Sequence, residues 1–557
     1  MAALHALELP LAPRRRLKRL LLGLVVLLLC CSLIQDASML SLVGAEAAES
    51  PGSGKLRLAM LTGGAQVGVC LLMAALQQRR GDRKWEGAKL RTLAPCLAVG
   101  WVIRFLLPIP EGVTEQAWSM LSIFVAMICA VVTGPLPPAG VTIVALSIAV
   151  FTGTVTFAEG LRAFTDEVVW LVLLAFFFAE GFQKTGLGDR IALTVIRAVG
   201  GTTLGVAYGL NSAELLVAAA MPCSAARAAA VFYPITLSVC RATGSDPAKG
   251  TENKCGKFLV ECCYQATATS SCLFLTGAAQ NYFVLKLAAG VGIDIPSPFK
   301  TWFMAALGPS VVSFVLTPLL AFKLMPPESK KTPDAPKEAE KQLQKMGPMS
   351  DDEKVFGAVI VVMVGLWATS SSNGIPPVVT ALCGLAFLIV MGVLSWEDCA
   401  KNKQGWGTFV SFASLVGLAA MLNNLGIVAW LASVVTAQIT AAGLTQVSAF
   451  LVIMLAYWGV HYLFASQVAH VSALFQPFLL MLVETGTPPI PAVFALAFAS
   501  NLFATLTPYA SAQSAVIFGG HYITAGEWYK AGFVFMIFYY IQWLVVGAVW
   551  WKMIGLL

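Results

Sequence analysis

Long apolar runs follow one another along most of this chain, and many are long enough to cross a lipid bilayer as helices. The runs at 117–134, 302–325 and 532–556 are examples. About 20 apolar residues span the hydrocarbon core of a bilayer, so the whole chain offers about 11–13 crossings. Only 12% of its residues are charged, whereas soluble domains carry about 25%. We therefore expect an all-α polytopic membrane protein that is embedded in the lipid bilayer.

The charge, the cysteines and the motifs exclude several classes of function. A formal net charge of +7 is ordinary for a membrane protein with basic loops and indicates no nucleic-acid partner. The 13 cysteines lie mostly inside apolar runs, without zinc-like or disulfide-framework spacing. The sequence contains no Gly-rich phosphate loop, HExxH motif or paired-carboxylate motif. We therefore expect a protein that is not an enzyme and that needs no cofactor or metal.

Polar segments divide the chain into four parts. Residues 1–55 combine a basic stretch with a short apolar run, which favours a removable targeting leader; a first transmembrane anchor is the alternative. Residues 326–354 are rich in Pro, Lys and Glu and are plainly aqueous in character. We interpret this stretch as a solvated connector. It separates a first membrane half at 56–325 from a second membrane half at 355–557.

A short polar patch occurs twice, once in each half. The first copy is Met221–Ile235 and the second is Phe464–Phe478. Aligning Arg227 with His470 brings hydroxyl, thiol or amide side chains, a Phe and a Pro into matching positions. Two related halves, each with a polar break and a cation inside apolar sequence, are typical of secondary transporters built from inverted repeats.

A second pair of polar breaks follows the two patches. The segments Thr267–Asn281 and Ser500–Gln513 carry hydroxyls, amides, Gly or Pro inside otherwise apolar runs. This composition predicts a helix that is unwound in the middle, so that its freed backbone groups line a cavity. The alternative is an ordinary buried helix interface, because hydroxyls can also bond back to their own helix.

The patches and breaks together predict one anion site near the middle of the bilayer. Helix ends that meet there would direct backbone N–H groups, hydroxyls and two cations at one small volume. Arg227 would offer a fork to a carboxylate, and His470 would add a donor whose charge depends on pH. The alternative is that both are unrelated polar residues of helix packing. Glu214 and His461 also lie in apolar runs, and their roles stay open. The candidate substrate-binding residues are Cys223, Ser224, Arg227, Thr276, Asn281, Ser466, Gln467, His470, Asn501 and Thr507.

Several long segments carry a resemblance to a known family. They include Arg104–Trp118, Phe176–Ile191, Leu273–Asn281 and His461–Gln467. In these segments the chain resembles the divalent anion:sodium symporter family, most closely its plastid branch of 2-oxoglutarate/malate (dicarboxylate) translocators. The resemblance implies two inverted repeats, each with one re-entrant hairpin and one broken helix. It also implies a transport domain that moves past a scaffold domain, which often forms a homodimer.

The resemblance places a Ser-Asn-Thr-type tripeptide at each hairpin tip, where it holds the carboxylates of the substrate. Ala225 and Val468 stand where the plastid branch has threonine, and Cys223 stands where it has serine. Pro508 replaces a usual His of that branch. Each buried polar group left without its partner costs about 1–3 kcal/mol. Both cations remain, so we still expect an anionic substrate.

These observations lead to one function hypothesis and two alternatives. We expect a carrier that exchanges C4/C5 dicarboxylates such as malate and 2-oxoglutarate across a plastid inner envelope membrane, by alternating access and without sodium. Moving a built-in cation without its anion through the bilayer costs several kcal/mol, which favours exchange over net uptake. The alternatives are a sodium-coupled dicarboxylate or sulfate symporter, and a degenerate relative that acts as a receptor or structural membrane protein.

Overall fold

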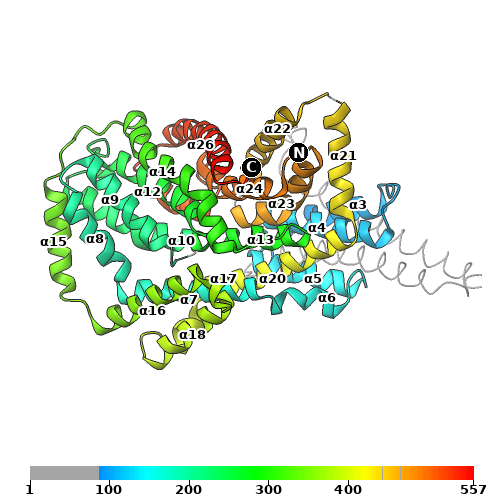
Figure 1. The fold of residues 1–557 in the computed structure, drawn as a ribbon, viewed down its shortest axis with the longest axis horizontal. Helices are drawn as coiled ribbons and strands as arrows, with labels where there is room; N and C mark the ends of the chain where they lie inside the picture. Colours follow the sequence, from blue (N-terminus) through cyan, green and yellow to red (C-terminus); the bar gives the residue numbers. More distant parts are fainter. Residues whose placement is uncertain (1–86, 222, 442, 465) are drawn as a thin grey trace, which may run out of the picture.

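The computed structural model describes residues 87–557 apart from positions 222, 442 and 465. This part of the chain is helical throughout, with no strand (Figure 1). Seven of its helices are long and apolar enough to cross a membrane. They are α4 (Glu115–Thr133), α7 (Glu167–Thr185), α14 (Pro298–Leu324), α20 (Lys403–Asn424), α22 with η6 (Gln446–Leu463), α23 (Gln467–Glu484) and α26 (Ala525–Met553).

The all-α polytopic fold is therefore confirmed, although the long spans described are fewer than the 11–13 crossings that we expected. The reason is that several apolar runs form shorter helices separated by breaks. The expected leader at 1–55 lies outside the described residues.

The helices occur in the same order in both halves. The first half contains α4, α5 (Pro138–Phe151), α6 (Phe157–Leu161), α7, α8 (Leu187–Val199), α9 (Thr203–Ala218), α10 (Ser224–Ala226), α11 (Tyr233–Ala242), α12 (Gly256–Leu273), α13 (Ala279–Gly290) and α14. The second half contains α16 (Asp351–Ala368), α18 (Pro377–Val390), α19 (Trp396–Lys401), α20, α21 (Ile427–Ala441), α22, α23, α24 (Pro489–Leu502), α25 (Ala512–Phe518) and α26. The two series correspond element by element, apart from short connecting helices.

Matching local signals begin the corresponding helices. Pro138 begins α5 and Pro377 begins α18, and each follows another proline. Proline suits the first turn of a helix because its missing N–H group has no helical partner there. Thr156 and Ser395 begin α6 and α19 with the same capping box. The repeat is therefore visible in local start signals as well as in the order of the elements.

The long helices that end the two halves, α14 and α26, pack against each other. Indole N–H groups of α26 donate to α14, from Trp551 to the Ala305 carbonyl at 2.9 Å and from Trp543 to the Ser313 hydroxyl at 2.9 Å. The Gln542 amide donates to the Pro309 carbonyl at 2.9 Å. These bonds satisfy polar groups that lipid could not.

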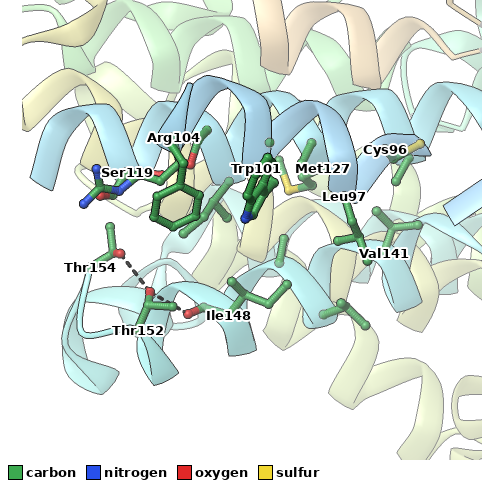
Figure 2. Close-up of a pocket in the computed structure, with 18 of the residues that line it drawn as sticks. Cys96, Leu97, Trp101, Arg104, Ser119, Met127, Val141, Ile148, Thr152 and Thr154 are labelled. Atoms are coloured by element: carbon green, nitrogen blue, oxygen red, sulfur yellow. Dashed lines mark hydrogen bonds between the residues drawn. The ribbon is translucent and has the colours of Figure 1, made fainter. Parts of the chain in front are cut away.

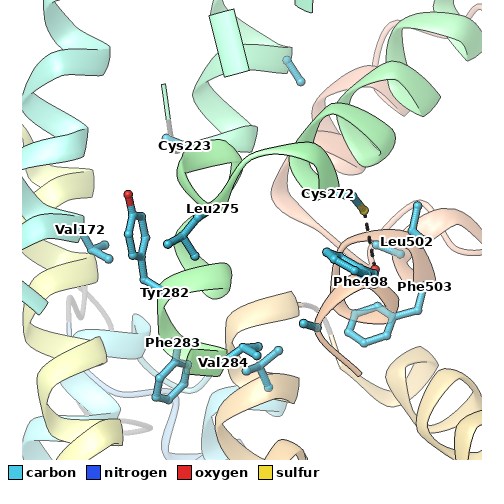
Figure 3. Packing of buried hydrophobic residues seen from close by; sticks show 14 of the residues in the cluster. Val172, Cys223, Cys272, Leu275, Tyr282, Phe283, Val284, Phe498, Leu502 and Phe503 are labelled. Atoms are coloured by element: carbon cyan, nitrogen blue, oxygen red, sulfur yellow. Dashed lines mark hydrogen bonds between the residues drawn. The ribbon is translucent and has the colours of Figure 1, made fainter. Parts of the chain in front are cut away.

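The broken helices meet beside this pair of long helices. Figure 3 shows Cys272 at the end of α12 pointing toward Phe498 of α24, with Leu502 and Phe503 beyond it. The Cys272 thiol lies 3.8 Å from the Phe498 carbonyl oxygen. Trp302 of α14 is fully buried and packs edge-on against the Phe498 ring. Buried side chains of the two halves are therefore in direct contact where α12 and α14 cross α24.

The connector differs from our expectation because part of it is a docked helix. Helix α15 (Asp334–Met346) lies beside α8 at the left edge of Figure 1. Its small residues Ala335 and Ala339 are fully buried, whereas its charged face carries the Arg197–Glu340 ion pair at 3.0 Å. A second link holds the end of the connector, because the Arg190 guanidinium of α8 donates to Glu353 of α16 at 2.6 Å. This hydrogen bond lowers the pKa of the Glu353 carboxyl.

Gly532 of α26 provides a test of this packing. A Cβ atom there would meet the Thr505 carbonyl oxygen, and it would lie 2.8 Å from the Leu506 Cα, on the broken helix of the second half. We expect Gly532→Ala to cost about 1–3 kcal/mol, because backbone has to shift. The measurement is the thermal midpoint of the purified protein in detergent.

Gly526→Ala is the matched control in the same helix. No atom lies within 4 Å of a Cβ built at Gly526, so alanine should leave the midpoint unchanged or raise it slightly. Equal midpoints for the two variants would contradict the close approach of α26 to the broken helix.

Candidate functional site

Each polar patch starts a helix at its centre. After α9 ends at Ala218, the Cys223 thiol accepts a hydrogen bond from the Ala226 backbone N–H and caps α10. In the second half, Ser466 accepts from the Ala469 backbone N–H and caps α23. We call Cys223–Arg227 tip 1 and Ser466–His470 tip 2. The two tips have the same construction, and each presents the N-terminal end of a helix.

Tip 1 continues into an unusual backbone conformation. The segment Arg227–Phe232 forms a π-helical turn before α11 begins at Tyr233. Such turns are rare and recur at functional sites. Ser224 and Ala225 of tip 1 are half-buried, as is Val468 of tip 2. The Gln404 amide of α20 reaches the Cys223 thiol at 3.6 Å.

Arg227 is fully buried and is held by the protein's own acceptors. Its side-chain partners are the Glu214 carboxylate at 2.7 Å, the Met221 and Gly277 carbonyls at 2.6 and 2.9 Å, and the Ser270 and Ser271 hydroxyls at 3.2 and 2.9 Å. We expected this fork to face a substrate carboxylate. In this conformation the fork instead ties tip 1 to α9 and α12, and Glu214 neutralises its charge.

The second half replaces this ion pair with two aromatic rings. In the alignment of the two patches, Tyr457 stands opposite Glu214 and His470 opposite Arg227. The Tyr457 and His470 rings lie edge to face, with centroids 4.5 Å apart. The Tyr457 hydroxyl bonds the Ser500 hydroxyl at 2.9 Å. His470 is fully buried, and neither of its ring nitrogens has a hydrogen-bond partner among the described residues.

Both predicted breaks are present, although the hydroxyls of Thr267, Thr269 and Ser271 bond back to helix α12, as the alternative expected. Break 1, Phe274–Ala278, separates α12 from α13 and contains one 3-10 turn, η5 (Leu275–Gly277). Break 2, Phe503–Ser511, separates α24 from α25 and contains η7 (Phe503–Thr505). Both lie inside apolar surroundings, as the mixture of hydroxyls, amides and Gly or Pro predicted.

The two halves are joined directly by side-chain amides beside the breaks. The Asn501 amide donates to the Asn281 side-chain oxygen at 2.7 Å, and the Gln280 amide donates to Asn501 at 2.9 Å. The Asn281 amide in turn donates to the Ser271 carbonyl at 2.8 Å. Asn281 and Asn501 therefore occupy one network, as their positions in the two breaks suggested.

Two of the remaining predicted residues, Thr276 and Gln467, make bonds between the neighbourhood of a tip and that of a break. The Thr276 hydroxyl donates to the Ala219 carbonyl at 2.7 Å, linking break 1 to the start of the loop before tip 1. The Gln467 amide of tip 2 donates to the Ser500 carbonyl at 3.0 Å. The Thr507 hydroxyl in break 2 is buried and has no partner among the described residues. Helix α10 also packs against α25, so tip 1 lies close to the end of break 2.

Sequence reasoning missed two contributors, Glu214 and Tyr457. Each is a polar group in an otherwise apolar helix that leads into a tip. The patch alignment, extended upstream, places Glu214 opposite Tyr457 and would have drawn attention to both, whereas the contact of Glu214 with Arg227 is visible only in the folded chain.

A separate cavity lies away from the tips. It has a volume of about 480 Å³ and is walled by α3 (Leu90–Phe105), α4 and α5 (Figure 2). Apolar side chains such as Trp101 and Met127 line it, and the Arg104–Glu115 ion pair at 2.8 Å stands at one end. None of the predicted site residues lines this cavity. The tips and breaks stay the predicted site.

Comparison with known proteins agrees with this architecture. Residues 88–557 match the family described as the sodium:sulfate symporter transmembrane region. The chain is 43% identical to "Dicarboxylate transporter 2, chloroplastic" of Spinacia oleracea, over 85% of this chain and 84% of that protein. It is 40% identical to "Putative malate transporter YflS" of Bacillus subtilis, over 85% of this chain and 98% of that protein.

Solved structures add a likeness of fold. MtrF of Neisseria gonorrhoeae, from a class of antimetabolite efflux pumps, aligns over 81% of this chain and 97% of its own, with a TM-score of 0.51 and 14% identity. Together with the two capped tips and two breaks, the match across residues 88–557 shows that this integral membrane protein belongs to the sodium:sulfate symporter family, the divalent anion:sodium symporters.

Proposed function

We propose that this protein is a secondary transporter that exchanges C4/C5 dicarboxylates, such as malate and 2-oxoglutarate, across a plastid envelope membrane. The observation that carries the proposal is a pair of capped helix ends, at Cys223 and Ser466, each bonded beside a break, with an amide link between Asn281 and Asn501 joining the two halves. Helix N-termini favour anions. Relatives that bear the names of chloroplastic dicarboxylate transporters and of a malate transporter support the substrate class and the location.

Each tip would receive one carboxylate of a dicarboxylate. The N-terminal ends of α10 and α23 carry partial positive charge and backbone N–H groups. Half-buried Ser224 and Ser466 add hydroxyls beside them. A dianion can place one carboxylate at each of these two helix N-termini. The short carbon chain between its carboxylates needs no polar partners. Alternating access then exposes this centre to one membrane face at a time.

The structure changes the physical argument for exchange. Glu214 neutralises Arg227, so the empty carrier does not contain Arg227 as an unpaired cation inside the bilayer. The support for sodium independence comes instead from Ala225 and Val468, which place no hydroxyl oxygen at the tips. A hard cation such as sodium prefers several oxygen ligands, and these tips offer few.

The first prediction concerns coupling. Vesicles that contain this protein and are loaded with malate should take up labelled malate in potassium or choline buffer, because a returning dicarboxylate lets the carrier cycle. Empty vesicles should take up almost none. Sodium-dependent uptake into empty vesicles would contradict exchange and favour a symporter; absence of transport under every condition would favour a receptor or structural role.

The second prediction concerns the buried ion pair. Glu214→Gln and Arg227→Gln should each destabilise the protein by about 3–5 kcal/mol, because each leaves an uncompensated buried charge. The loss of stability in the double variant should be smaller than the sum of the losses in the two single variants. Thermal midpoints of the purified variants in detergent measure this.

Lys401 and Glu397 provide the control for the ion pair. This pair is exposed, with 73% and 72% of the side chains accessible. Glu397→Gln should therefore change stability by about 1 kcal/mol or less. Strictly additive losses in the Glu214/Arg227 double variant would show that the buried pair does not act as a unit.

The third prediction concerns the missing hydroxyls. Val468→Thr or Ala225→Thr adds a donor to a half-buried tip position. Each should lower the apparent malate KM about tenfold or more, because one further hydrogen bond to a charged group contributes about 1.5–3 kcal/mol. The measurement is initial exchange rate against malate concentration. Unchanged KM values would place both positions away from the substrate.

A further inference from the structure

Two buried histidines in the second half have unused hydrogen-bonding capacity. His461 and His470 are both fully buried. None of their four ring nitrogens makes a hydrogen bond of good geometry with the described residues, although the Ala510 backbone lies close enough to His461 for a weaker contact. Buried polar groups are nearly always satisfied, and an exception in a native structure calls for an explanation such as a ligand.

The two rings form one cluster beside break 2. Their centroids lie 5.2 Å apart. The Phe503 ring stacks on His461 with a centroid distance of 3.7 Å and also lies 4.5 Å from His470. Tyr457 and Phe464 close the remaining sides of His470, with centroids at 4.5 and 5.1 Å. The apolar walls keep water away from the imidazoles.

Further unsatisfied donors lie in the adjoining break 2. The Thr505 and Thr507 hydroxyls are buried and lack partners among the described residues. Break 2 is close because Phe503, its first residue, is in contact with both histidines. The second half thus combines imidazole N–H groups and hydroxyls that can all donate.

The positions of the first half that correspond to this cluster are occupied differently. Arg227, at the position of His470, already donates to five acceptors, and the Thr276 hydroxyl of break 1 is bonded to Ala219. The patch alignment places Ala218 opposite His461. The histidine pair is therefore a feature of the second half alone.

The surroundings indicate what kind of ligand fits. The ionisable groups that face the pair from the packed elements are the phenols of Tyr457 and Tyr462. No ion pair joins either histidine to a carboxylate in the described part of the chain. The described residues contain no group of three or more His, Cys, Asp or Glu side chains that could hold a metal ion. Each neutral imidazole keeps one N–H group and each hydroxyl can donate, so the cluster can offer several donors to one acceptor, and a carboxylate accepts the strongest such bonds in a dry site.

We propose that His461 and His470 together bind one carboxylate of the transported dicarboxylate. The inference rests on the proposed function and assigns His461, which has no counterpart in the first half, as a second donor beside His470. The two ends of the substrate are then held differently: one by the histidines, the other at tip 1. Both rings are enclosed in this conformation, so the carboxylate reaches them when tip 2 and break 2 move apart.

The small number of histidines makes a direct test practical. The chain has four histidines, and the three in the described part are His461, His470 and the exposed His521. We would label the imidazole nitrogens of the full chain with 15N and record nitrogen spectra in lipid nanodiscs with and without malate. His→Gln variants assign the signals. Malate should shift the His461 and His470 signals and leave His521 unchanged.

Binding of malate to the variants tests the same inference by affinity. His461→Gln and His470→Gln should each weaken malate binding about tenfold or more, since one charge-assisted hydrogen bond is lost. His521→Gln is the matched control and should bind as the unaltered protein does. Thermal midpoints recorded alongside show whether a variant is folded.

The outcomes separate this inference from the proposed function. A malate-induced shift of both buried signals supports the histidine pair. No shift of His461, in protein that still exchanges malate, overturns the pair and leaves the proposed function standing. If neither histidine responds and the vesicles exchange no dicarboxylate, both proposals fail together.

Discussion

The buried ion pair between Glu214 and Arg227 is the constraint on which the first half of the site depends. A cation inside a membrane protein is tolerated when it is paired and fully hydrogen-bonded. Here one guanidinium joins the end of α9, the loop before tip 1, the end of α12 and break 1. The position of tip 1 thus follows from the need to satisfy one charge. Arg227 is in this sense a positioning residue rather than an open anion receptor.

The two halves share a backbone plan but differ in their chemistry. The same element order, the same helix caps and two breaks recur, whereas the charged pair of the first half becomes Tyr457 and His470 in the second. In the first half, Arg227 makes five internal hydrogen bonds. The second keeps imidazoles and hydroxyls without partners. A repeated fold has therefore produced an asymmetric centre.

Much of the fold and part of the site could be predicted from the sequence. Apolar runs, polar patches and breaks showed the membrane class, the capped tips and the unwound helices, because each leaves a local trace in residue types. The contacts of Arg227 could not be predicted from the sequence, because Glu214 and Gly277 come close to it only in the folded chain. The docking of helix α15 could not be predicted from composition, because its buried face consists only of small alanines and the rest of the helix is rich in lysine and glutamate. The plastid leader and homodimer stay predictions.

The amide link between Asn281 and Asn501 has a mechanical consequence. These side chains belong to different repeats, and further contacts cross in the same way: Gln476 of α23 donates to the Leu287 carbonyl of α13, and α10 packs on α25. A movement of one repeat alone toward a membrane face would break these hydrogen bonds between the repeats, and the lipid offers no other partners for the polar groups. In the alternating-access cycle that we propose, these links would make the two repeats move as one body, so that both ends of a substrate would change sides together.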